Sequence, residues 1–245
     1  MYTAERVQWW LKRAGSPEYQ AAYRRIASYV PNDARVVLDV ACGPGYLLKL
    51  LYDANPDRLL IGMDASETML AEAQNRFALD GPPKIITPGN LDATGTGVVL
   101  VKDNLMDAEL PAELADFTTF TFPETGIEHE SNEIDRRLMV RHRIIAGHVH
   151  SDDLADMKAT LRGNYHLTKL TKKNGTFLST NYDIEQGQAS IEGSSKLYSK
   201  MFGLLFDSIE FVDDRRIYSD VDESVKLNMP KNSRRGYFIV KRVRA

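Results

Sequence analysis

The chain has 245 residues, of which 43% are hydrophobic and 27% charged, and its formal net charge is −3 at pH 7. This length and apolar content suffice for one α/β domain with a full core. The slight negative charge disfavours broad binding to nucleic acid, although residues 136–143 and 231–244 are locally basic. A single cysteine excludes an internal disulfide and a cysteine-cluster zinc site. The sequence has neither a signal peptide nor an apolar run of about 18 residues, so we expect a cytoplasmic protein without a membrane partner. These features leave the oligomeric state open.

Two helices are expected before the first strand. Aromatic and aliphatic residues recur at helical spacing through residues 7–29, and Gly15-Ser16-Pro17 interrupts the pattern. Large apolar side chains at such spacing usually pack on a core, which predicts that these helices cover the sheet.

The segment 35–46, R-V-V-L-D-V-A-C-G-P-G-Y, predicts a buried parallel strand, a glycine turn and the start of a helix. Such a turn presents backbone N–H groups at the rim of a sheet, and Gly43 and Gly45 have no side chain to keep a ligand away. The dinucleotide fingerprint would need a third glycine at position 48, where this chain has Leu48. The turn therefore predicts a nucleotide-like ligand, and the missing third glycine argues against a dinucleotide.

A second strand and helix follow directly. Residues 58–64 form a strand-like run that ends in Asp64, 19 residues after Gly45, near the spacing of an acid that binds ribose hydroxyls. Ser66 is the expected N-cap of the next helix, whose apolar face carries Met69, Leu70, Ala73 and Phe77.

The rest of the chain alternates less clearly. We expect a loop at 82–97, with only the run 84–87 able to form a short strand. Further strands are predicted at 98–101, 117–122, 176–182, within 208–219, and at 236–243, and helices near 134–145, 151–175 and 197–206.

The sequence D-V-A-C-G-P-G at 39–45 resembles the first motif of the class I S-adenosylmethionine-dependent methyltransferases, an acid followed by a small residue, Gly, x and Gly. The resemblance implies a doubly wound α/β fold with a seven-stranded, mostly parallel sheet, helices on both faces and an antiparallel last strand. It also implies one methyltransferase domain over residues 1–245. Within it, residues 1–30 would form a helical lid and residues 123–150 an inserted segment that shapes the substrate pocket.

The same resemblance implies S-adenosylmethionine as cofactor and assigns residues to its site. The cofactor-binding candidates are Asp39, Ala41, Cys42, Gly43, Gly45, Asp64, Ala65, Met69, Asp103, Asn104, Leu105 and Thr121. In this assignment Asp64 binds the ribose and Asp103 accepts from the adenine amine. The substrate-binding candidates are Trp10, Tyr23, Phe122, Glu124 and His129. Enzymes of this kind that methylate bases usually have Asn- or Asp-Pro-Pro-aromatic after the fourth strand, whereas this chain has T-F-P-E at 121–124, which argues against base methylation.

Four of the five histidines lie between residues 129 and 150. His148 and His150 are candidate general bases, since histidine titrates near neutral pH. Packed or solvated histidines are the competing interpretation. A metal site would need more ligands than this pair, and we expect none.

Three function classes remain open from the sequence. The first is a methyltransferase acting on an N or O nucleophile of a small molecule. The second is an NAD-dependent reductase. The third is a non-catalytic protein of this fold that binds a partner through the basic segment 136–143.

Overall fold

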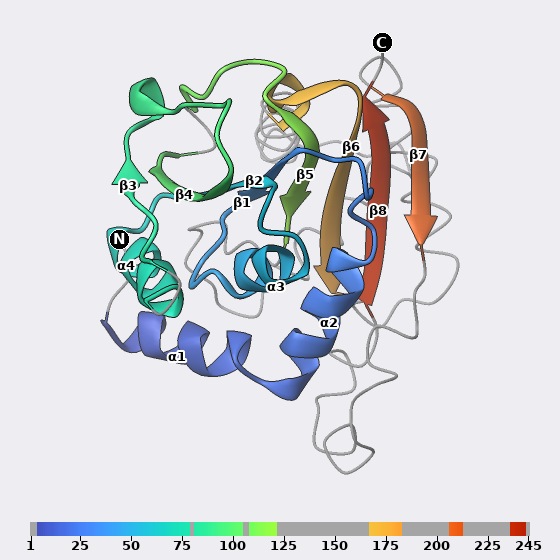
Figure 1. The fold of residues 1–245 in the computed structure, drawn as a ribbon. Helices are drawn as coiled ribbons and strands as arrows, with labels where there is room; N and C mark the ends of the chain where they lie inside the picture. Colours follow the sequence, from blue (N-terminus) through green and yellow to red (C-terminus); the bar gives the residue numbers. More distant parts are fainter. Residues whose placement is uncertain are drawn as a thin grey trace, which may run out of the picture.

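The structure is a computed structural model, and it describes residues 4–78, 81–104, 108–121, 167–182, 206–212 and 236–243. The helices are α1 Ala4–Ala14, α2 Pro17–Ala27, α3 Tyr46–Ala54, α4 Glu67–Arg76 and the short 3₁₀ helix η1 Pro88–Asn90. The strands are β1 Val36–Val40, β2 Leu59–Asp64, β3 Ile85–Ile86, β4 Gly97–Lys102, β5 Ala115–Phe120, β6 Thr171–Tyr182, β7 Phe206–Val212 and β8 Gly236–Val243. They build the α/β fold that the sequence predicts (Figure 1).

All described strands belong to one sheet, in the order β3-β4-β2-β1-β5-β6-β8-β7. The pairs from β3 through to β6 are parallel, and β8 runs antiparallel to both β6 and β7, so the predicted antiparallel last strand is confirmed. The chain reverses its direction of winding at β1, which has β2 on one side and β5 on the other. Ligands of open α/β sheets bind where the strand order reverses, at the carboxyl ends of the strands.

The sheet has one strand more than predicted. Ile85 and Ile86 pair with Leu100 and Val101 of β4, so an edge strand forms within the run 84–87, the part of the expected loop that could form a short strand. Its position next to the buried half of β4 gives its backbone hydrogen-bonding groups a partner, as the bond from the Leu100 N–H to the Lys84 carbonyl shows.

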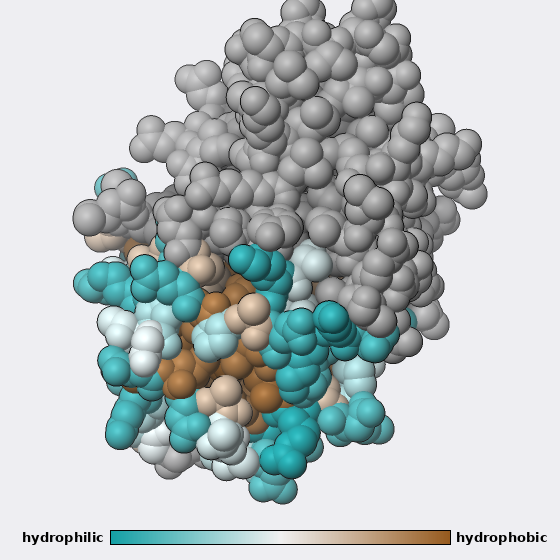
Figure 2. All heavy atoms as spheres, turned by 90° about the horizontal axis from the view of Figure 1, so that it is seen from above, coloured by the Kyte–Doolittle hydropathy of each residue, from teal (hydrophilic) through white to brown (hydrophobic). Residues whose placement is uncertain are grey.

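Two apolar clusters cover the two faces of the sheet. Alternate residues of β1 point to opposite faces, so that Val37 joins one cluster and Leu38 the other. The first cluster includes Ala21, Ala22 and Ile26 of α2 together with residues of α3 and α4, and Figure 1 shows these helices on one side of the sheet. From above that view, apolar side chains gather in one patch with hydrophilic side chains around it (Figure 2).

The two predicted N-terminal helices are confirmed, and so is the expectation that they pack on the core. Ala22 and Ile26 of α2 are fully buried. The structure thus places α2 in the hydrophobic core, while its role as a lid stays a prediction. The predicted N-cap is also confirmed, because the Ser66 hydroxyl accepts the Met69 N–H at 3.3 Å.

The predicted end of a long helix at 172–175 is wrong. Residues 171–175 belong to β6, after a helical turn at 167–170. The register between β5 and β6 shifts there: Ala115 pairs with Thr171 and Phe117 with Thr176, so the intervening residues bulge and Asn174 has a φ of +61°. The glycine and lysines that suggested a helix end instead form this bulge. The other helices predicted after residue 122 lie largely outside the described residues.

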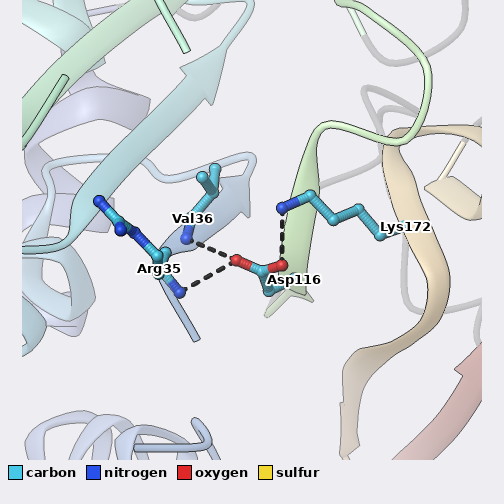
Figure 3. A network of polar contacts seen from close by, with 4 residues as sticks. All are labelled: Arg35, Val36, Asp116 and Lys172. Atoms are coloured by element: carbon cyan, nitrogen blue, oxygen red, sulfur yellow. Dashed lines mark hydrogen bonds and ion pairs between the residues drawn. The ribbon is translucent and has the colours of Figure 1, made fainter. Parts of the chain in front are cut away.

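A carboxylate ties together the amino-terminal parts of three neighbouring strands (Figure 3). Asp116 Oδ2 accepts the backbone N–H groups of Arg35 at 3.0 Å and Val36 at 2.9 Å. Its Oδ1 accepts from Lys172 Nζ of β6 at 2.7 Å. Asp116 therefore links β5 to the start of β1 and to β6.

Candidate functional site

The glycine turn connects β1 to α3 through residues 41–45. Gly43 and Gly45 have φ values of +53° and +74°, in the left-handed region that glycine adopts without strain. A Cβ on Gly45 would lie 2.9 Å from the Cβ of Ala73, whereas a Cβ on Gly43 would have nothing within 4 Å. Gly45 thus permits close packing against α4, and Gly43 leaves its outer side free for a ligand. Ala41, another predicted cofactor residue, is also left-handed, with a φ of +57°.

Asp64, at the end of β2, contacts this turn directly. Its Oδ2 accepts the Gly43 N–H at 2.9 Å, and its Oδ1 accepts the Ser66 N–H at 2.8 Å. Burial raises the pKa of Asp64, although the hydrogen bonds from the backbone of Ser66, Gly43 and Ala65 act in the opposite direction. The structure therefore joins the two motifs that the sequence placed 19 residues apart.

Asp39 lies in β1, only 1% exposed. The hydroxyl of Thr119, its register partner in β5, donates to Asp39 Oδ1 at 2.6 Å. Burial and, to a smaller extent, the nearby charge of Asp64 raise the pKa of Asp39 to about 7, against the effect of this hydrogen bond. Among the described residues Asp39 has no cationic partner, so this carboxylate suits a ligand that brings positive charge.

Thr119 is not among the site residues predicted from the sequence. Its signal lies in the sequence F-T-T-F-T-F, where Thr118 and Thr119 stand in the middle of a buried strand. The two hydroxyls serve opposite faces, since Thr118 Oγ1 pairs with Thr171 Oγ1 at 2.8 Å while Thr119 reaches Asp39. Buried hydroxyls need partners, and only the position of β5 between β1 and β6 reveals which ones.

The tip of β4 lies next to Asp64. The backbone N–H of Asp103 donates to the Asp64 carbonyl at 3.2 Å. The Asp103 carboxylate accepts the N–H groups of Asn104 at 2.7 Å and Glu109 at 3.0 Å, and so holds the loop after β4 in place. An adenine amine would have to share these oxygens.

The remaining predicted cofactor residues in the described part surround the same strand ends. Cys42 is buried, and its N–H donates to the Met63 carbonyl at 3.0 Å. Ala65 is exposed, Met69 is buried in α4, and Thr121 is buried directly after β5.

Two predicted substrate residues are described, and both belong to an aromatic series on α1 and α2. The Tyr23 ring stacks on Tyr46 with centroids 6.1 Å apart and an interplanar angle of 9°. Burial, together with the nearby Asp39, raises the pKa of Tyr23. Trp10 is half-buried and meets Tyr19 edge-on at 6.5 Å. Their contact with a substrate stays a prediction.

Six predicted site residues lie outside the described residues: Leu105, Phe122, Glu124, His129, His148 and His150. Within the described ranges, no group of three His, Cys, Asp or Glu side chains is arranged to hold a metal ion. In the same ranges, no helix has the length and apolar character needed to cross a bilayer.

The packing of α3 on the sheet explains why position 48 is not glycine. In the dinucleotide fingerprint the third glycine lets helix and strand approach closely. Here the glycine is on the strand: a Cβ on Gly62 of β2 would lie 2.4 Å from Leu48 Cδ1. Leu48 fills the space that Gly62 leaves.

Comparison with known proteins agrees with this geometry. A family model described as a methyltransferase domain matches residues 37–132, which include the glycine turn and Asp64. No curated protein matches the chain.

Solved structures of methyltransferases share the fold. A SAM-dependent methyltransferase from Aquifex aeolicus is 12% identical, with a TM-score of 0.55 over 99% of this chain and 100% of that one. The N-methyltransferase NodS from Bradyrhizobium japonicum WM9 is 10% identical, with a TM-score of 0.55 over 95% and 99% of the two chains. The magnesium protoporphyrin IX methyltransferase from Synechocystis PCC 6803, solved with bound SAM, is 15% identical, with a TM-score of 0.51 over 100% and 86%.

The family match supports the predicted cofactor, S-adenosylmethionine. Residues 37–132 match a methyltransferase domain, and the chain has the fold of the class I S-adenosylmethionine-dependent methyltransferases.

Proposed function

We propose that this protein transfers a methyl group from S-adenosylmethionine to an N or O nucleophile of a small molecule. The observation that carries the proposal is the hydrogen bond between the Gly43 N–H and Asp64 Oδ2. It brings a turn with free space beside Gly43 next to a carboxylate at the neighbouring strand tip. This is the combination that an adenosyl group attached to a charged amino-acid chain requires.

Each charged or polar group of the site has a proposed task. Asp64 keeps lone-pair capacity beyond its hydrogen bonds from the backbone of Gly43, Ser66 and Ala65, and this capacity accepts from the ribose hydroxyls. The free side of Gly43 lets the amino-acid end of the cofactor approach the backbone closely. The cationic part of that end would favour the ionised form of Asp39, a buried carboxyl whose pKa is about 7 without the cofactor. When bound, S-adenosylmethionine supplies a methyl group already activated on a sulfonium sulfur.

Since the donor is activated, the protein chiefly has to hold the acceptor in line with it. Positioning of this kind contributes about 7–11 kcal/mol in well-oriented systems. Thr121 lies at the end of β5 beside the switch point, so we place the acceptor over the segment that follows it. His148 and His150 are our candidates for taking the proton from the acceptor, with Trp10, Tyr23, Phe122, Glu124 and His129 lining its site.

Two considerations favour a small acceptor. The sequence T-F-P-E at 121–124 departs from the pattern of base-methylating enzymes. One of the proteins with this fold is a magnesium protoporphyrin IX methyltransferase, and magnesium protoporphyrin IX is a small molecule.

A methyl-transfer assay tests the proposal. The protein is incubated with S-adenosylmethionine labelled in the methyl group and a panel of small amines, alcohols and phenols, and labelled product is measured beside S-adenosylhomocysteine release. We expect turnover with at least one acceptor class, and loss of that turnover in Asp64→Ala. Absence of turnover across the panel, in protein that does bind the cofactor, would favour the non-catalytic alternative.

A further inference from the structure

This inference rests on the proposed function and concerns a residue outside the methyltransferase motifs. Arg76 is the last residue of α4. Its Nε donates to the backbone carbonyl of Pro44, in the middle of the glycine turn, at 2.8 Å. Its guanidinium also lies over the ring of Tyr46, 3.4 Å from the ring centroid. One side chain thus contacts the turn at two points.

Two backbone hydrogen bonds hold the turn, from the Gly43 N–H to Asp64 Oδ2 and from the Gly45 N–H to the Cys42 carbonyl. Gly45 is the N-cap residue of α3 and offers no side-chain cap to the helix. Three residues of the turn, Ala41, Gly43 and Gly45, have left-handed φ values, and for Ala41 this conformation is strained. A segment with such backbone angles keeps them only when its surroundings fix them. Arg76 donates a side-chain hydrogen bond to the Pro44 carbonyl of this turn.

Tyr46 extends this support to the N-terminal helices. One face of its ring receives Arg76, and the ring stacks on Tyr23 of α2. Its hydroxyl lies 2.7 Å from the position that a Cβ on Gly15 would occupy, in the connection between α1 and α2. The ring is therefore held between α4 and the N-terminal helices, while its backbone continues directly from the turn.

We propose that Arg76 is a positioning residue for the cofactor: together with Tyr46 it holds the Gly43–Gly45 backbone in the conformation that receives the amino-acid end of S-adenosylmethionine. Arginine suits this task because its planar guanidinium donates a hydrogen bond in its plane while its face stacks on an aromatic ring. S-adenosylmethionine and S-adenosylhomocysteine have the same amino-acid end. Arg76 is therefore expected to affect binding of both equally.

The test combines calorimetric titration with steady-state kinetics on Arg76→Leu. We expect the dissociation constants of S-adenosylmethionine and S-adenosylhomocysteine to rise together by about tenfold, which corresponds to ~1.4 kcal/mol. The kcat at saturating cofactor and the KM for the acceptor should stay within about twofold of the wild type, as for a loss of uniform binding. Unchanged cofactor affinity in a folded Arg76→Leu protein would overturn the proposal.

Matched variants separate positioning from folding. Arg76→Lys keeps a cation and a donor but not the planar fork, so its affinity should recover to within about threefold of the wild type. Tyr46→Leu removes the stacking partner and should weaken binding in the same way as Arg76→Leu. Arg24→Leu replaces an exposed arginine of α2 and should change nothing. Equal losses in the Arg24 and Arg76 variants would contradict a specific role for Arg76.

A measurement without ligand distinguishes this proposal from the function on which it rests. The amide resonances of Gly43 and Gly45, in ¹⁵N-labelled protein, should shift in Arg76→Leu and remain in place in Arg24→Leu. If these amides shift but the wild type binds no S-adenosylmethionine, the proposed function fails. The contacts of Arg76 with Pro44 and Tyr46 then have a structural role only. If the wild type binds and the amides do not shift, the function stands and the role of Arg76 is refuted.

Discussion

The backbone N–H of Gly43 donates a 2.9 Å hydrogen bond to the Oδ2 atom of Asp64. This bond joins the turn after β1 to the tip of β2 at the place where the winding of the sheet reverses. A buried acid, Asp39, lies in the strand that leads into the turn. The candidate site is therefore built from consecutive elements of the chain, and its parts can be tested one by one.

The two glycines of the turn should respond differently to a methyl group. Gly45→Ala should lower the free energy of unfolding by about 1–3 kcal/mol through its clash with Ala73, in addition to the left-handed backbone cost of roughly 1–2 kcal/mol. Gly43→Ala should carry only the backbone cost and instead weaken cofactor binding, since its Cβ would occupy the free side of the turn. Urea denaturation and calorimetric titration of both variants measure these effects. Equal destabilisation by the two changes would refute the distinction.

Gly62 should be intolerant of a side chain. A Cβ there would lie 2.4 Å from Leu48 Cδ1 and 3.0 Å from both Cys42 Sγ and Leu100 Cδ2. Because all three neighbours are buried, Gly62→Ala should reduce the unfolding free energy by about 1–3 kcal/mol. The double variant Gly62→Ala/Leu48→Ala should be more stable than the sum of the two single changes predicts, as measured in a double-mutant cycle. Strict additivity would show that Leu48 is not the obstacle.

Asp39 should make stability depend on pH. Its pKa in the folded protein is about 7, against an ordinary value of ~3.9, so between these values the folded state binds the extra proton. Stability should therefore fall as pH rises through this window, because ionising the buried carboxyl opposes folding. Asp64, Cys42 and Tyr23 all interact electrostatically with Asp39. The Asp39→Asn variant isolates the contribution of Asp39 to the pH dependence of stability. Chemical denaturation from about pH 5 to about pH 8 should show the wild type losing stability relative to Asp39→Asn. A constant difference between the two proteins would contradict the assignment.

Asp116 should have the opposite pH dependence. Burial raises the pKa of its carboxyl, but the hydrogen bonds from Lys172, Val36 and Arg35 outweigh burial and hold the pKa below its usual value (Figure 3). Its stabilising effect should be complete above the ordinary value of ~3.9 and disappear as pH falls through the lowered pKa. At neutral pH, Asp116→Asn should lower the free energy of unfolding by on the order of 1 kcal/mol, measured by chemical denaturation. Lys172→Met tests the ion pair separately, and a loss for Asp116→Asn that persisted in acid would argue against this explanation.

The sequence predicted the first half of the fold well because local patterns and tertiary packing agree there. The buried strand 36–40, the two N-terminal helices and the Ser66 cap all follow from burial and capping rules that act over a few residues. The β6 bulge was not predictable in the same way. Lys172, in the bulge, donates to Asp116, 56 residues away. A long-range contact of this kind leaves no periodic signal in the sequence.

The candidate site also combines residues that local sequence patterns predict with residues that only long-range contacts place. Gly43, Gly45 and Asp64 stand at spacings that a motif can capture. Thr119 and Arg76 reach the site only through strand register and helix packing, at sequence separations of 80 and 32 residues from their hydrogen-bond partners. Side chains that support a site from other elements therefore become visible only in the folded chain.

Calorimetric titration with S-adenosylmethionine tests the central claim most directly, in the wild type and in the Asp64→Ala and Asp64→Asn variants. We predict one site per chain in the wild type and a loss of about 1–3 kcal/mol of binding free energy in Asp64→Ala, with a smaller loss in Asp64→Asn, which keeps one acceptor oxygen. NADH should not bind. Equal binding by all three proteins, or no binding by the wild type, would contradict the claim that the glycine turn and Asp64 together hold the cofactor.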